Sequence, residues 1–182
     1  WMKPDGKGQL LVLQITAGGV EYEKRSAELL AGTTAQTLSI PLKEFLAKGT
    51  QAPLEGAALK DIQKFAIYIN AVDGAKLSST LYFDEIKVSG TSSGGTGGDT
   101  GGPEQPAATM PPFEFESGVD GWVVNQSDGT TSVSADWAAS GSKSLKATVT
   151  AGGNVEIFRQ GAQDFTGRTA LKANVNIAAA GT

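Results

Sequence analysis

A tract in the middle of the chain, residues 90–112, has a sequence that is not expected to form a packed core. It reads GTSSGGTGGDTGGPEQPAATMPP, so most of its residues are Gly, Pro, Ser, Thr or Ala. Such residues bury too little apolar surface to offset the entropy that is lost on folding. The tract is therefore predicted to be a linker, which divides the 182-residue chain into residues 1–89 and 113–182.

Both flanking segments have the composition of short strands joined by turns. The chain contains 24 Gly, and its apolar residues are mainly Val, Ile, Leu and Ala in short runs, which favours an all-β protein. It contains no Cys and no His. This excludes disulfides, thiol nucleophiles, imidazole bases and the usual zinc sites, and it leaves carboxylate chemistry or an oxygen-bound cation.

The distribution of charged and apolar residues argues against two classes of partner. The formal net charge is -4 and the Lys and Arg residues are scattered, so no basic stripe is present and nucleic acid is not an expected partner. No apolar run approaches the roughly 20 residues that span a bilayer, so no membrane partner is expected. No signal peptide is visible, and the start at Trp1 leads us to expect a fragment of a longer chain.

Alternation of apolar and polar residues predicts strands in the first segment. These strands are expected at residues 9–16, 20–26, 36–42 and 64–70. The second of them is polar, with Tyr22 exposed or half exposed, and Pro41 indicates a strand end or an edge strand. Residues 41–49 and 57–63 have helical spacing, but they are long enough only for a turn or two.

Residues 80–88, TLYFDEIKV, change phase in the middle. The apolar pair before Asp84 and the apolar pair after Glu85 would lie on opposite faces of a regular strand. A β-bulge at these two acidic residues would bring both pairs to the same face. Such a bulge can also turn a carboxylate toward a ligand.

The second segment shows the same alternation. Strands are predicted within residues 113–122, 141–150, 154–160 and 170–178. Because no long helix separates any of the strands, the expected fold is an antiparallel β-sandwich.

Three stretches resemble jelly-roll carbohydrate-binding modules of bacterial glycoside hydrolases. FEFESGVDGW and SGSKSLKATV are similar to the opening of such a module, and LYFDEIKVSG is similar to its last strand. The order is inverted in this chain. Residues 1–89 therefore resemble the C-terminal half of one module, residues 90–112 a linker, and residues 113–182 the N-terminal half of a following module.

The resemblance implies that the chain is cut within a module on both sides. Together the two halves have about the length of one complete module, and a 23-residue flexible linker has a root-mean-square span of roughly 26 Å. We therefore expect the halves to close into one circularly permuted jelly-roll sandwich.

The resemblance also implies a structural Ca²⁺ ion between the first and last strands. The matching ligands are Glu116, Asp84 and the backbone carbonyl of Lys143 or of Ser142. Carboxylate and carbonyl oxygens suit Ca²⁺. The alternative is that these acidic residues simply face solvent on alternating strands.

Sugar recognition needs an aromatic platform and polar groups for the hydroxyls. Trp1 is the best platform candidate, Trp122 is expected in the core, and Trp137 is compatible with either role. The polar candidates are Gln14, Tyr68, Arg159, Lys172, Asn174 and Asn176. They would form one polar face if their strands share a sheet, and the alternative for each is a solvated surface.

These observations predict a non-catalytic module that binds plant cell-wall polysaccharide of the β-glucan or mannan type. We expect it to be secreted and to target a glycoside hydrolase domain of the same parent chain. The alternative is a structural or adhesive β-sandwich repeat of a bacterial surface protein. Two Glu pairs, Glu21 with Glu23 and Glu114 with Glu116, have spacings compatible with a glycosidase, but nothing in the sequence marks a catalytic acid, so enzyme activity is not expected.

Overall fold

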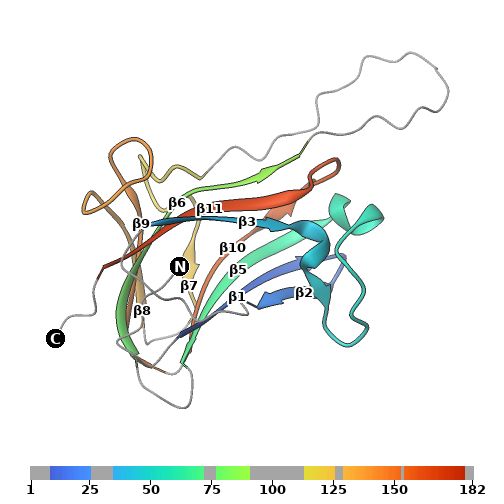
Figure 1. Ribbon diagram of the computed structural model, residues 1–182, viewed down its shortest axis with the longest axis horizontal. Coiled ribbons are helices and arrows are strands. Elements are labelled where there is room, and N and C mark those ends of the chain that lie inside the picture. Colours follow the sequence, from blue (N-terminus) through green and yellow to red (C-terminus); the bar gives the residue numbers. More distant parts are fainter. Residues whose placement is uncertain are drawn as a thin grey trace.

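The computed structural model describes residues 9–25, 35–71, 77–90, 113–125, 129–152 and 154–178. Within these residues the chain forms two antiparallel sheets in separate layers, which confirms the predicted all-β sandwich (Figure 1). The six-stranded sheet has the order β4 (Leu46–Ala47), β2 (Val20–Arg25), β1 (Gln9–Ala17), β5 (Ile62–Ala71), β10 (Asn154–Gln163) and β7 (Val123–Val124). The five-stranded sheet has the order β3 (Gln36–Pro41), β11 (Ala170–Ala178), β6 (Leu77–Ser89), β9 (Ser144–Gly152) and β8 (Gly129–Ser134).

Both sheets contain strands from both sides of the central tract. In the six-stranded sheet, β5 pairs with β10 along most of its length. In the five-stranded sheet, β11 lies between β3 and β6, and β6 also pairs with β9. The two segments therefore close into one sandwich, as expected, and neither completes a sheet layer by itself.

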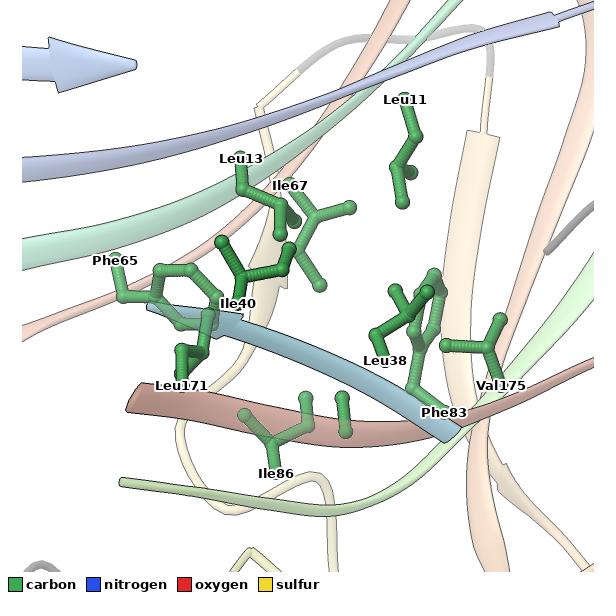
Figure 2. A pocket seen from close by; sticks show the side chains of 11 residues that line it. Leu11, Leu13, Leu38, Ile40, Phe65, Ile67, Phe83, Ile86, Leu171 and Val175 are labelled. Atoms are coloured by element: carbon green, nitrogen blue, oxygen red, sulfur yellow. The ribbon is translucent and has the colours of Figure 1, made fainter. Parts of the chain in front are cut away.

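The period-two pattern of the strands sets which side chains form the core. Leu11, Leu13 and Ile15 of β1 are at most 5% exposed, and they lie opposite Ile69, Ile67 and Phe65 of β5. Figure 2 shows apolar side chains of β1, β3, β5, β6 and β11 converging between the layers. The gap left among them is about 10 Å³, which is no more than one water molecule needs, so it is part of the core rather than a ligand site.

The phase change in β6 is a bulge, as predicted. Asn174 lies opposite Asp84, but Lys172, two residues earlier on β11, lies opposite Lys87, three residues later on β6. Glu85 takes up the extra residue with a φ of 48°. As a result Phe83 and Ile86 are both buried in the same core, although residues three apart point to opposite faces of a regular strand.

Some local predictions were wrong. Tyr22 is only 9% exposed, because it lies opposite Ile15 and therefore points into the core. The strand predicted at the start of residues 113–122 is a single bridge from Phe113 to Ile86, because Phe115 has a φ of 56° and turns the chain. β4, β7 and β8 were not predicted.

The two stretches with helical spacing form short 3-10 helices. These are η1 (Leu42–Glu44) and η2 (Gly56–Lys60). Pro41 ends β3, an edge strand, as expected. In the part of the chain that the structure describes, no helix has the length and apolar character needed to cross a membrane.

Candidate functional site

The outer face of the six-stranded sheet brings together two of the predicted binding residues. Gln14 on β1 and Tyr68 on β5 point away from the core because their neighbours along each strand point into it. The Tyr68 hydroxyl lies 3.3 Å from Gln14 Oε1. Gln14 is only 3% exposed and Tyr68 is half buried, so this face is more enclosed than a solvated sheet surface.

A buried carboxylate lies beside this pair. Glu156 of β10 is opposite Tyr68 in the register and is 4% exposed. It accepts hydrogen bonds from the Tyr68 hydroxyl at 2.8 Å, from Asn125 Nδ2 at 2.6 Å and from Lys64 Nζ. The three donors satisfy a charge that would otherwise be costly to bury. Glu156 therefore fixes the positions of side chains on β5 and after β7.

The pKa values of the two central groups reflect this arrangement. Burial acts to raise the pKa of Glu156, but hydrogen bonds from Lys64, Tyr68 and Asn125 outweigh it, so the pKa lies below its usual value. Burial, followed by the hydrogen bond to Glu156, raises the pKa of Tyr68. At neutral pH the carboxylate is therefore charged and the phenol carries its proton.

The same network continues toward β2. Gln14 Nε2 donates to Glu23 Oε1 at 3.1 Å, and Glu23 also pairs with Lys48 at 3.4 Å and Arg25 at 3.5 Å. A surface hollow on this face is lined by Val12, Gln14, Glu21, Glu23, Arg25, Lys48 and Tyr68. We call these seven residues the β1–β2 hollow. A second hollow shares Glu23, Arg25 and Lys48 with it and extends past β4.

The other predicted binding residues do not join this face. Arg159 lies opposite Phe65 and so points to the inner side of the sheet, where it donates to the Asp120 carbonyl at 3.1 Å and stacks over Phe113. Lys172, Asn174 and Asn176 are on β11 of the other sheet. The single polar face therefore does not form, because these strands do not share a sheet. Trp1 lies outside the described residues.

Asn174 has its own partners on the five-stranded sheet. Its Oδ1 accepts a hydrogen bond from Thr37 Oγ1 at 2.7 Å, and its Nδ2 donates to Glu85 Oε2 at 2.6 Å. Asn174 therefore connects β3 and the β6 bulge.

The predicted calcium ligands hold the loop between β8 and β9. Asp84 is fully buried, and its carboxylate accepts backbone N–H groups of Glu85, Ala139 and Ser140 at 2.8–2.9 Å. β6 also reaches the Glu116 segment, since Phe113 N donates to the Ile86 carbonyl at 2.9 Å.

Glu116 holds the second half of the same loop. It accepts the N–H groups of Ser142 and Lys143 and the Ser142 hydroxyl at 2.8–2.9 Å, while Lys143 Nζ donates to the Glu116 carbonyl at 3.1 Å. The backbone hydrogen bonds from Lys143 and Ser142 lower the pKa of Glu116. We call Asp84, Glu116 and the loop residues that they hold the carboxylate clamp.

In the structure the loop itself supplies the partners of both clamp carboxylates. Every carboxylate oxygen of Asp84 and Glu116 already accepts an N–H or O–H hydrogen bond. Among the described residues, no group of three or more Asp, Glu, His or Cys side chains is placed to hold a metal ion. Calcium therefore stays a prediction from the resemblance.

The sequence did not reveal the residues that organise the polar face. Glu23, Lys64, Asn125 and Glu156 were not predicted as site residues. The alternation in NVEIFRQ predicts that Glu156 faces outward. Which residues surround it depends on the pairing of β5 with β10, which lie on opposite sides of the central tract in the sequence.

Comparison with known proteins agrees with the resemblance. Residues 113–182 match the family described as mannanase, galactose-binding domain-like, from bacteria. This match confirms the resemblance to carbohydrate-binding modules of bacterial glycoside hydrolases and supports carbohydrate binding as the general function. Neither the curated proteins nor the solved structures contain a significant match to the chain.

Proposed function

We propose that the chain is a non-catalytic module that binds plant cell-wall polysaccharide, of the mannan or β-glucan type, in the β1–β2 hollow. The observation that carries the proposal is the hydrogen-bonded network of Gln14, Glu23, Tyr68 and Glu156, which lies beneath this hollow. The family match of residues 113–182 supports the class of ligand.

The hollow offers the chemistry that sugar hydroxyls require. Glu21 and Glu23 supply acceptors, whereas Arg25 and Lys48 supply donors with side chains that are 68% and 54% exposed. The partly exposed Tyr68 adds apolar surface for pyranose C–H groups. Because Gln14 and Glu156 already hold Tyr68 in place, binding does not have to order it.

The carboxylates with shifted pKa values in the described residues do not have the shift of a glycosidase acid. A glycosidase needs one carboxylic acid with a raised pKa to protonate the leaving group. In the described part of the chain, the carboxylates whose pKa departs from the usual value are Glu116, Asp136, Glu156 and Asp164, and all four are lowered. Glu116, which belongs to one of the two Glu pairs, holds a loop instead.

We propose that the protein acts outside the cell, where plant polysaccharide is found, and that its parent chain also carries a glycoside hydrolase domain. Such a domain would gain substrate through effective concentration even if the module binds weakly. The competing function is a structural or adhesive repeat, which needs no hollow of mixed donors and acceptors.

Affinity electrophoresis in gels containing mannan, xylan, mixed-linkage glucan or a cellulose derivative tests the proposal. We expect retardation by at least one polysaccharide and a loss of most of it in Arg25→Ala and Lys48→Ala. Lys60→Ala, at the exposed end of η2, removes the same charge outside the residues that line the hollow and should migrate like the wild type. Unretarded migration of the wild type in all four gels would favour the structural repeat.

A further inference from the structure

Trp137 lies on the other side of the molecule, over the outer face of the five-stranded sheet. Its ring centroid is 6.3 Å from that of Tyr82, with the planes tilted by 48°. Tyr82 is 5% exposed, whereas Trp137 is partly exposed. Trp137 therefore covers Tyr82 and still presents part of its own indole to solvent.

Charged groups flank this aromatic pair. Asp136 Oδ2 accepts hydrogen bonds from Lys146 Nζ at 2.7 Å and from the Tyr82 hydroxyl at 3.1 Å. Hydrogen bonds from Lys146, Ser134 and Tyr82 lower the pKa of Asp136 to about 2, so the carboxylate stays charged in neutral solution. The side chains of Asp136 and Lys146 are 58% and 30% exposed, so both remain accessible to a ligand.

The loop that carries Trp137 is fixed from several directions. The Trp137 carbonyl accepts a hydrogen bond from Ser144 Oγ at 2.6 Å, and Ser144 is fully buried. The carboxylate clamp holds the residues that follow, from Ala139 to Lys143. A ring on a loop held in this way binds a ligand with little loss of conformational entropy.

We propose that Trp137, Asp136 and Lys146 form a second carbohydrate-binding site, on the face opposite the β1–β2 hollow. The class of ligand rests on the proposed function. The C–H face of a pyranose ring stacks on the exposed part of the indole, its hydroxyls donate to the Asp136 carboxylate, and a hydroxyl oxygen accepts from the Lys146 ammonium group.

Two sites on opposite faces allow one module to bind polysaccharide at two points. A single module engages two polysaccharide chains, or two stretches of one chain, at the same time. The second contact then forms at a high effective concentration, and binding to a polymer exceeds binding to a short oligosaccharide. The competing role for Trp137 is to cover Tyr82 alone, which affects stability but not binding.

Isothermal titration of the full chain with mannohexaose and with cellohexaose separates these roles. For the sugar that binds, we expect two sites in the wild type and one in Trp137→Ala, because the loss of stacking weakens that site by about tenfold or more. Asp136→Asn keeps the size of the side chain and should weaken the same site, whereas Trp137→Phe should retain part of its affinity. Thermal unfolding of each variant verifies that it is folded.

Fluorescence gives an independent readout. In a Trp1→Phe background the remaining indoles are Trp122, which is fully buried, and Trp137, which is partly exposed. A saturable blue shift of the emission on adding the bound oligosaccharide therefore reports on Trp137.

The outcomes distinguish the second site from the first. One site in the wild type that Arg25→Ala weakens and Trp137→Ala leaves unchanged would overturn the second site and support the hollow. One site that responds only to Trp137→Ala would overturn the hollow and support the Trp137 site. No binding of either oligosaccharide, and no retardation in any gel, would overturn both.

Discussion

The two outer faces of the sandwich use carboxylates in opposite ways. On the six-stranded sheet, Glu156 is 4% exposed and is surrounded by three donors, two from β5 and one from the residue after β7. On the five-stranded sheet, the Asp136 side chain is 58% exposed and extends from a loop. A buried carboxylate cannot lose its partners cheaply, whereas an exposed ion pair contributes little to stability. The first face therefore has polar side chains that are held in fixed positions. The second face has an aromatic pair flanked by charged side chains that can change partners.

Removal of each carboxylate gives the largest expected contrast between the faces. Glu156→Ala leaves Lys64, Tyr68 and Asn125 without their common acceptor, so we expect the free energy of unfolding to fall by about 3 kcal/mol. Asp136→Ala should lower the unfolding midpoint much less, because Lys146 can turn to solvent and only the Tyr82 hydroxyl loses a partner. Urea unfolding of both variants measures the contrast.

Glu156→Gln is the matched control for the buried site. It keeps the volume and one acceptor oxygen but removes the charge that holds Lys64, so its loss should lie between that of Glu156→Ala and the wild type. Equal losses for Glu156→Ala and Asp136→Ala would contradict the difference between the faces.

Two glycines test how strongly the clamp holds the Trp137 loop. Gly141 has a φ of 64°, and a Cβ at this position would lie 2.3 Å from Glu116 Oε1. Gly18 has a φ of 56°, but nothing lies within 4 Å of a Cβ there. Both Ala variants pay the left-handed backbone cost of about 1 kcal/mol. Only Gly141→Ala also displaces Glu116 from its three hydrogen bonds.

We therefore expect Gly141→Ala to lower the unfolding midpoint more than Gly18→Ala and to alter the emission of Trp137 in the Trp1→Phe background. Similar midpoints and unchanged emission would mean that the Glu116 side chain moves aside freely. The loop would then not be fixed by the clamp.

The sequence predicted well the features that are set within a single strand, such as its buried face and its bulge. The alternation around Leu13 and Ile67 identified buried faces, and the phase change at Asp84 identified the bulge. The sequence predicted poorly the features that depend on how neighbouring strands pair, such as the burial of a side chain on a polar strand. Tyr22 was expected at least half exposed because its strand is polar, but its register against Ile15 puts it in the core.

The candidate site shows the same limit. Gln14 and Tyr68 were recognised because each faces outward on its own strand. Arg159 was assigned to the same face because the side of its strand was unknown, and Glu156, three residues earlier, was missed. A polar network across β1, β5 and β10 depends on long-range pairing, which a residue pattern within one strand does not encode.

Calcium tests the carboxylate clamp, because Asp84 of β6 and Glu116 are its predicted ligands. The oxygens of Asp84 and Glu116 already accept N–H and O–H groups, and a cation would have to displace some of those donors. A ligand that binds only the folded state raises the unfolding temperature. If the clamp holds the loop without an ion, the midpoint is the same in excess EDTA and in excess Ca²⁺. A midpoint that rises with Ca²⁺ and falls again with EDTA, and that does neither in Glu116→Gln, would instead establish a calcium site and require the loop from Ala139 to Lys143 to rearrange around the ion.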